Sequence, residues 1–131
     1  LIHSDVHAEN LLLDDERVIF IDWQNAAFAN ASVDLAGLIL CCDSAVQESH
    51  WRKILTSWQE RVLAYGVELS EVNSAINTVP QAIVWNFVGV SSWLATFEAE
   101  KLRDAHTLQC HWRRLVSGLL TTWPHDLTIS S

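Results

Sequence analysis

Blocks of apolar and polar residues predict that the chain begins with a short β-hairpin. Apolar runs at residues 11–13 and 18–21 flank an acidic triplet that favours a turn, as in two antiparallel strands with a tight connection. Opposite ends of such a pair are neighbours in space, so Asn10, before the first strand, is expected beside Asp22, after the second. Asp5 precedes the same end of the hairpin. Three polar side chains are therefore expected to converge there.

Beyond the hairpin the pattern predicts helices. Residues 23–32 show no clear period and are expected to form a loop, with Ser32 as the N-cap of a buried apolar helix. Apolar residues then recur every three or four positions, and Gly66 ends one such stretch. Pro80 is expected to separate two others, because the residue before a proline is pushed out of the helical region. The further predicted helices cover residues 46–65, 70–79, 81–98 and 104–123.

Composition indicates one globular domain. The predicted elements place it in the α+β class, mainly helical, with a small hairpin beside four or five helices. Half of the 131 residues are apolar, and the chain contains only four Gly and two Pro, so it can bury a core. The Trp residues that fall on the apolar stripes of the helices are expected in that core.

Charge and cysteine usage limit the partners and the compartment. Eight basic and sixteen acidic residues give a net charge of −8, which argues against nucleic acid or an anionic membrane surface as a partner. The apolar stretch at residues 82–97 is too short, and too often interrupted by polar residues, to span a bilayer. Cys41 and Cys42 are adjacent within an apolar run and are typical of buried thiols in a reducing compartment, which favours a cytoplasmic location.

The polar run HSDVHAEN, at residues 3–10, could form an ordinary loop, a metal cage or a catalytic loop. A zinc-dependent hydrolase that uses His3, Asp5, His7 and Asp22 is disfavoured, since no downstream His or Cys has the spacing that zinc sites usually show. The segments VIFIDW and SVDLAGLI follow the polar run. Together the three segments resemble the aminoglycoside phosphotransferase and choline kinase-like family, whose catalytic loop has the form His-Gly-Asp-x-His-x-x-Asn.

The resemblance covers about residues 1–40 and implies a protein-kinase-like fold that carries out ATP-dependent phosphoryl transfer. Such transfer to a hydroxyl needs Mg²⁺ held by oxygen ligands and a carboxylate that takes the hydroxyl proton. By the resemblance, Asp5 is the catalytic base, and Asn10 and Asp22 bind the metal and the nucleotide as Mg²⁺-ATP. The resemblance also implies supporting residues: His3, which braces the loop, His7, and Asp34, which ties the loop backbone to the following helix.

The chain departs from the family pattern in two ways. The family's Gly between His and Asp is Ser4 here, which costs about 1 kcal/mol or more if φ at that position is positive and nothing if φ is negative. The sequence also holds neither the Gly-rich loop nor the strand Lys that contact the phosphates in kinases. We therefore expect residues 1–131 to be a single partial domain, the C-terminal lobe alone. Residues 1–31 would form the catalytic loop, hairpin and metal-binding loop, and residues 32–131 a helical subdomain.

Two functions are open on this basis. The first is an ATP-dependent small-molecule kinase whose site is completed by a missing N-terminal lobe, so that the fragment alone would be inactive. Its acceptor would be a small hydroxylated molecule, and the acidic balance would suit a cationic one. The second is a truncated, non-catalytic kinase-like module that binds a partner.

Overall fold

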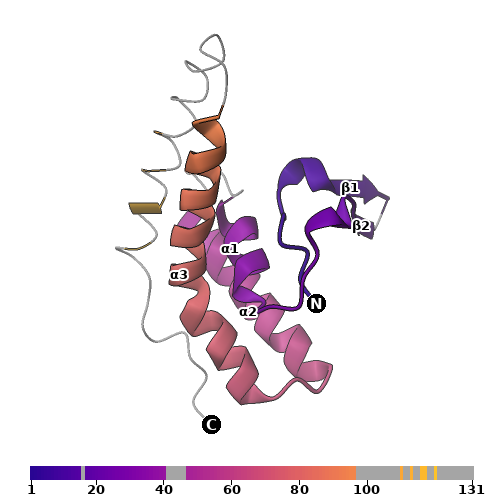
Figure 1. The fold of residues 1–131 in the computed structure, drawn as a ribbon. Coiled ribbons are helices and arrows are strands. Elements are labelled where there is room, and N and C mark those ends of the chain that lie inside the picture. Colours follow the sequence, from indigo (N-terminus) through magenta and orange to yellow (C-terminus); the bar gives the residue numbers. More distant parts are fainter. Residues whose placement is uncertain are drawn as a thin grey trace.

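The computed structural model describes residues 1–15, 17–40 and 47–96, together with positions 110, 113, 116, 117 and 120. In this part of the chain, a two-stranded antiparallel sheet and two short 3-10 helices precede three α-helices. The molecule is therefore α+β and mainly helical, as predicted. The hairpin lies on one side of α1 (Ser32–Leu40), and α3 (Leu69–Leu94) lies on the other (Figure 1).

The predicted hairpin is confirmed. Strand β1 (Leu11–Asp14) pairs along its whole length with β2 (Arg17–Phe20) in antiparallel register. The hydrogen bonding continues one step past the strands, since the Ile21 N–H donates to the Asn10 carbonyl over 3.0 Å. This pairing brings Asn10 to the same end of the hairpin as Asp22, which follows Ile21 directly.

The first two helices begin close to where the sequence pattern indicates, with a change at one cap. Ser32 is the first residue of α1 rather than its cap, because Asn30 Oδ1 accepts the Ser32 N–H at 2.9 Å and so caps the helix. Helix α2 (Gln47–Ala64) confirms the prediction for residues 46–65. Gly66 follows it with φ 84°, a left-handed conformation that glycine adopts without strain.

The predicted break at Pro80 is wrong. Helix α3 (Leu69–Leu94) is continuous and contains Pro80 in its interior. An interior proline lacks the N–H of one backbone hydrogen bond and costs the helix about 3 kcal/mol. Burial outweighs this cost, because Val79 before the proline and Ile83 after it are fully buried in the same core.

The hydrophobic core lies where α1 and α3 pack together and α2 closes against them. The expectation that the Trp residues of the apolar stripes lie in the core holds for Trp51 of α2, which is 1% exposed, and Trp58 packs against the same core partly buried. Trp85 of α3, which lies on no predicted stripe, is 72% exposed. The buried members of the core are Leu35, Ala36, Ile39, Leu40, Trp51, Leu55, Ile76, Val79, Ala82, Ile83 and Val116.

Several sequence predictions lie outside the described residues. They concern Cys41, Cys42 and most of the helix predicted over residues 104–123. The five described positions within that segment are helical, and Val116 joins the core. None of the helices in the described part of the chain is long and apolar enough to cross a membrane.

Candidate active site

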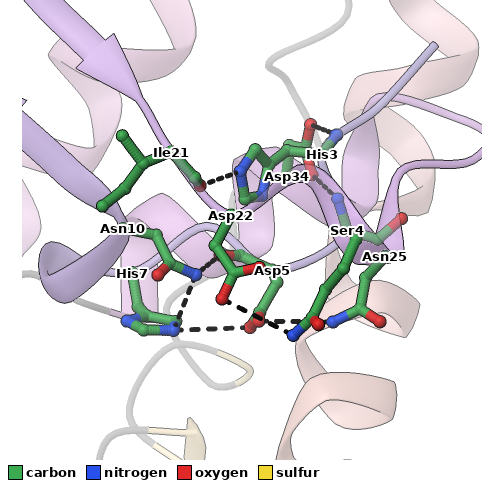
Figure 2. A network of polar contacts seen from close by, with 10 residues as sticks. His3, Ser4, Asp5, His7, Asn10, Ile21, Asp22, Asn25 and Asp34 are labelled. Atoms are coloured by element: carbon green, nitrogen blue, oxygen red, sulfur yellow. Dashed lines mark hydrogen bonds and ion pairs between the residues drawn. The ribbon is translucent and has the colours of Figure 1, made fainter.

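One carboxylate ties the N-terminal segment to α1. Asp34, in the first turn of α1, accepts the His3 backbone N–H at Oδ2 over 2.7 Å and the Ser4 backbone N–H at Oδ1 over 2.8 Å (Figure 2). Ser4 has φ 67°, so it adopts the left-handed conformation. This conformation lets two consecutive backbone N–H groups point toward the same carboxylate. Consecutive N–H groups arranged in this way commonly bind anions.

A glycine of α1 makes a second close approach to the same segment. A Cβ at Gly37 would lie 2.7 Å from the backbone carbonyl oxygen of Val6, closer than side chains come to such an atom. Only glycine fits where the helix meets the loop. Asp34 and Gly37, three residues apart on one helix face, therefore fix the backbone on both sides of Asp5.

His3 links the N-terminal segment to the end of β2. Its side chain is 1% exposed, and Nε2 donates to the Ile21 carbonyl over 2.8 Å. A carbonyl can only accept, so the ring proton is on Nε2, and Nδ1 is buried without a partner among the described residues. The ring also packs against Phe20 and Trp23, with centroids 5.8 and 4.7 Å away. Because Asp22 follows Ile21, His3 fixes the position of Asp22 relative to the N-terminal segment.

Asn10 is held through its amide nitrogen. The residue ends the 3-10 helix η1 (Ala8–Asn10) and is 7% exposed. Its Nδ2 donates to the Asp5 backbone carbonyl over 2.9 Å and lies 3.0 Å from His7 Nε2 (Figure 2). Since Nδ2 is engaged on both sides, the carbonyl oxygen Oδ1 is the atom that Asn10 can offer to a ligand.

The carboxylates of Asp5 and Asp22 lie with these groups at the open end of the hairpin (Figure 2). Asp5 Oδ1 is 3.5 Å from His7 Nε2, and Asp5 Oδ2 accepts from Asn25 Nδ2 over 3.4 Å. Asp22 is exposed and has φ 60°. In the described part of the chain, neither carboxylate has a Lys or Arg partner. Their negative charge is therefore available to attract a cation.

The donor set at this end of the hairpin suits Mg²⁺. In phosphoryl-transfer sites this ion takes one or two protein carboxylates and completes its octahedron with phosphate and water oxygens. Asn10 Oδ1 and the Asp22 carboxylate are hard oxygen donors of this kind.

No group of three or more His, Cys, Asp or Glu side chains gathers into a metal cage within the described ranges. The zinc-hydrolase alternative, which counts His3 among its ligands, therefore gains no support, since His3 Nε2 is bound to the Ile21 carbonyl.

The family of the chain follows from comparison with known families. The model of the phosphotransferase enzyme family matches residues 1–67, which include the polar run at residues 3–10, the hairpin, α1 and α2. The chain belongs to the phosphotransferase enzyme family. Kinases of this family generally use ATP and Mg²⁺. Neither the curated proteins nor the solved structures give a match.

All six residues indicated by the resemblance lie within the part that matches the phosphotransferase family. The structure gathers four of them, Asp5, His7, Asn10 and Asp22, at the end of the hairpin (Figure 2). The other two, His3 and Asp34, hold the backbone of the N-terminal segment in place. Asp34 accepts its N–H groups, and the His3 ring binds the Ile21 carbonyl. The chemical role of each residue stays a prediction.

Sequence reasoning misses two residues of the site. Asn25, whose amide contacts Asp5, falls in a stretch without periodicity, and nothing in the sequence distinguishes it from other loop amides. Gly37 does leave a signal. A glycine inside an apolar helix costs about 1 kcal/mol relative to alanine, so its presence indicates that another segment approaches closely.

A cavity of about 640 Å³ lies apart from this site, between the N-terminal residues, the loop before α1, and helices α2 and α3. Its lining includes Trp58, Val62 and Glu71. Neither carboxylate of the candidate site nor Asn10 lines it, so the cavity is not part of the site.

Proposed function

We propose that the chain forms the catalytic and metal-binding half of an ATP-dependent phosphotransferase that moves the γ-phosphoryl group to a hydroxyl of a small molecule. The observation that carries this proposal is the gathering of Asp5, Asn10 and Asp22 at one end of the hairpin. Membership of the phosphotransferase enzyme family supports the same reaction class.

In this proposal each of the three residues has a separate task. Asp5 orients the acceptor hydroxyl and takes its proton as the oxygen attacks the γ-phosphorus. The bond between the γ-phosphorus and the bridging oxygen breaks, and ADP leaves. Asn10, through Oδ1, and Asp22, through its carboxylate, hold Mg²⁺-ATP. When bound, the ion neutralises charge on the phosphate oxygens. The side chain of Asp5 is 37% exposed, which leaves it accessible to an acceptor.

We further propose that residues 1–131 are the C-terminal lobe of a protein-kinase-like fold and that an N-terminal lobe completes the nucleotide site. The exposed apolar surface of the hairpin supports this arrangement, since Leu13 is 82% exposed and Val18 is 56% exposed. A two-stranded hairpin is marginally stable in water by itself, and exposed apolar patches of this kind mark surfaces that other structure covers.

The acceptor that fits this site best is a cationic hydroxylated molecule. The two carboxylates at the hairpin end have no Lys or Arg partner in the described part, and the chain carries a net charge of −8. A surface with this sign of charge raises the local concentration of cations. Choline and an aminoglycoside are suitable test acceptors because both carry hydroxyl groups and positive charge.

Phosphoryl transfer from radiolabelled ATP tests the proposal, in the whole protein that contains this chain. Asp5→Ala should lower kcat by about 10²-fold to 10⁴-fold, the usual contribution of a general base. Asp14→Ala is the matched control, because it removes an exposed carboxylate at the turn of the same hairpin, where Asp14 pairs with Arg17. This control should keep the activity.

Two outcomes would contradict the proposal in different ways. Full activity of Asp5→Ala would show that the assignment of the base is wrong. No transfer by the wild type, combined with no binding of Mg²⁺-ATP in calorimetry, would favour the non-catalytic binding module instead.

A further inference from the structure

A single ring nitrogen of His7 lies within reach of two residues of the candidate site. Nε2 is 3.0 Å from Asn10 Nδ2 and 3.5 Å from Asp5 Oδ1. A ring nitrogen that carries a proton can donate, and one without a proton can accept, but it cannot do both. A hydrogen bond in each of the two contacts would require opposite states of the same atom.

The neighbours of Asn10 decide between these states. Its Nδ2 also donates to the Asp5 backbone carbonyl over 2.9 Å. That carbonyl can only accept, so the amide nitrogen, and not Oδ1, must face it. The same nitrogen has only hydrogens to present to His7, so His7 Nε2 accepts and the ring proton is on Nδ1. The shorter of the two contacts agrees with this assignment.

We propose that His7 is a positioning residue that accepts a hydrogen bond from Asn10 and so keeps Asn10 Oδ1 turned toward the metal position. Because His7 Nε2 carries no proton in this state, it gives Asp5 no hydrogen bond, and the Asp5 carboxylate stays available for the acceptor hydroxyl. This inference rests on the proposed function and adds to it the group that sets the orientation of a metal ligand.

Titration of the whole protein that contains this chain with Mn²⁺ tests the metal-directed part. Binding is detected through paramagnetic broadening of the backbone amide signals of Asn10 and Asp22. Mn²⁺ prefers the same octahedral oxygen sites as Mg²⁺. His7→Phe keeps the size of a ring but cannot accept, and it should weaken Mn²⁺ binding by about tenfold or more, as loss of a residue that orients a metal ligand typically does. His7→Gln can accept through Oε1 and should retain most of the affinity.

His50→Phe is the matched control, because it makes the same substitution at an exposed position of α2. It should bind Mn²⁺ as the wild type does. The rescue by His7→Gln separates an effect on hydrogen bonding from a general loss of structure, which the backbone amide spectra of all the variants also report.

The tautomer of His7 is measured directly by nitrogen-15 NMR of the ring, and it does not depend on metal or activity. The expected result is an unprotonated Nε2. A proton on Nε2 in neutral His7, or equal Mn²⁺ affinity in His7→Phe and wild type, would overturn this inference while leaving the proposed function intact. Absence of Mn²⁺ binding by the wild type would overturn the proposed metal site and this inference together.

Discussion

Replacement of Ser4 by glycine should stabilise the protein, because Ser4 has φ 67°. A Cβ in the left-handed region costs about 1–2 kcal/mol, and Ser4→Gly removes it. Glycine also gives the unfolded chain more freedom, which offsets about 0.4–1 kcal/mol of that gain. The expected net gain is about 0.5–1 kcal/mol in the free energy of unfolding.

The contact that Ser4 makes is not lost in this substitution. Its backbone N–H donates to Asp34 Oδ1 over 2.8 Å, and glycine has the same N–H. The Ser4 hydroxyl has no hydrogen-bond partner within the described residues. For a chain of this length the gain should raise Tm by about 2–4 °C. Urea unfolding followed by circular dichroism gives the free energy, and a thermal scan gives Tm.

Two control variants separate the backbone explanation from others. Ser4→Ala also loses the hydroxyl but keeps the Cβ, so it should not stabilise. Ser57→Gly places glycine at an exposed position of α2 and should destabilise by about 0.5 kcal/mol. The reasoning would be refuted if Ser4→Gly were less stable than the wild type, or if Ser4→Ala gained as much as Ser4→Gly.

Three further substitutions test the contacts that hold the site and the core, each by urea unfolding. Asp34→Ala removes the acceptor of two backbone N–H groups and should cost about 3 kcal/mol, so a loss near zero would contradict the anchoring role. Gly37→Ala brings a Cβ to within 2.7 Å of the Val6 carbonyl and should cost about 1–3 kcal/mol; unchanged stability would show that the loop yields easily. Pro80→Ala restores a helix N–H and should gain about 2 kcal/mol, and a loss instead would show that the ring contributes packing.

The hairpin and α2 could be predicted from the sequence because their signals are local. Alternating apolar runs around a turn specify the pairing of β1 with β2, and a periodic apolar stripe ended by Gly66 specifies α2. The helix break predicted at Pro80 is wrong, because the local cost of an interior proline is outweighed by the burial of Val79 and Ile83 in one core. The cap of α1 was misplaced by a different cause. Asn30 and Ser32 are both good capping residues, and only the path of the loop selects between them.

The sequence by itself determined the family and the identity of the candidate site residues, since the spacing of Asp5, Asn10 and Asp22 around a hairpin is a local pattern. The resemblance already indicated His3 and Asp34 as supporting residues, and the tertiary structure decided which atoms they contact. The positive φ of Ser4 and the place of Gly37 depend on a contact between segments about thirty residues apart in the chain. The orientation of the Asn10 amide likewise follows from which atoms surround it in the fold. Hydrogen-bond direction and steric fit are properties of such neighbours, so a glycine such as Gly37 can signal a close approach in the sequence, but only the fold shows which atoms meet.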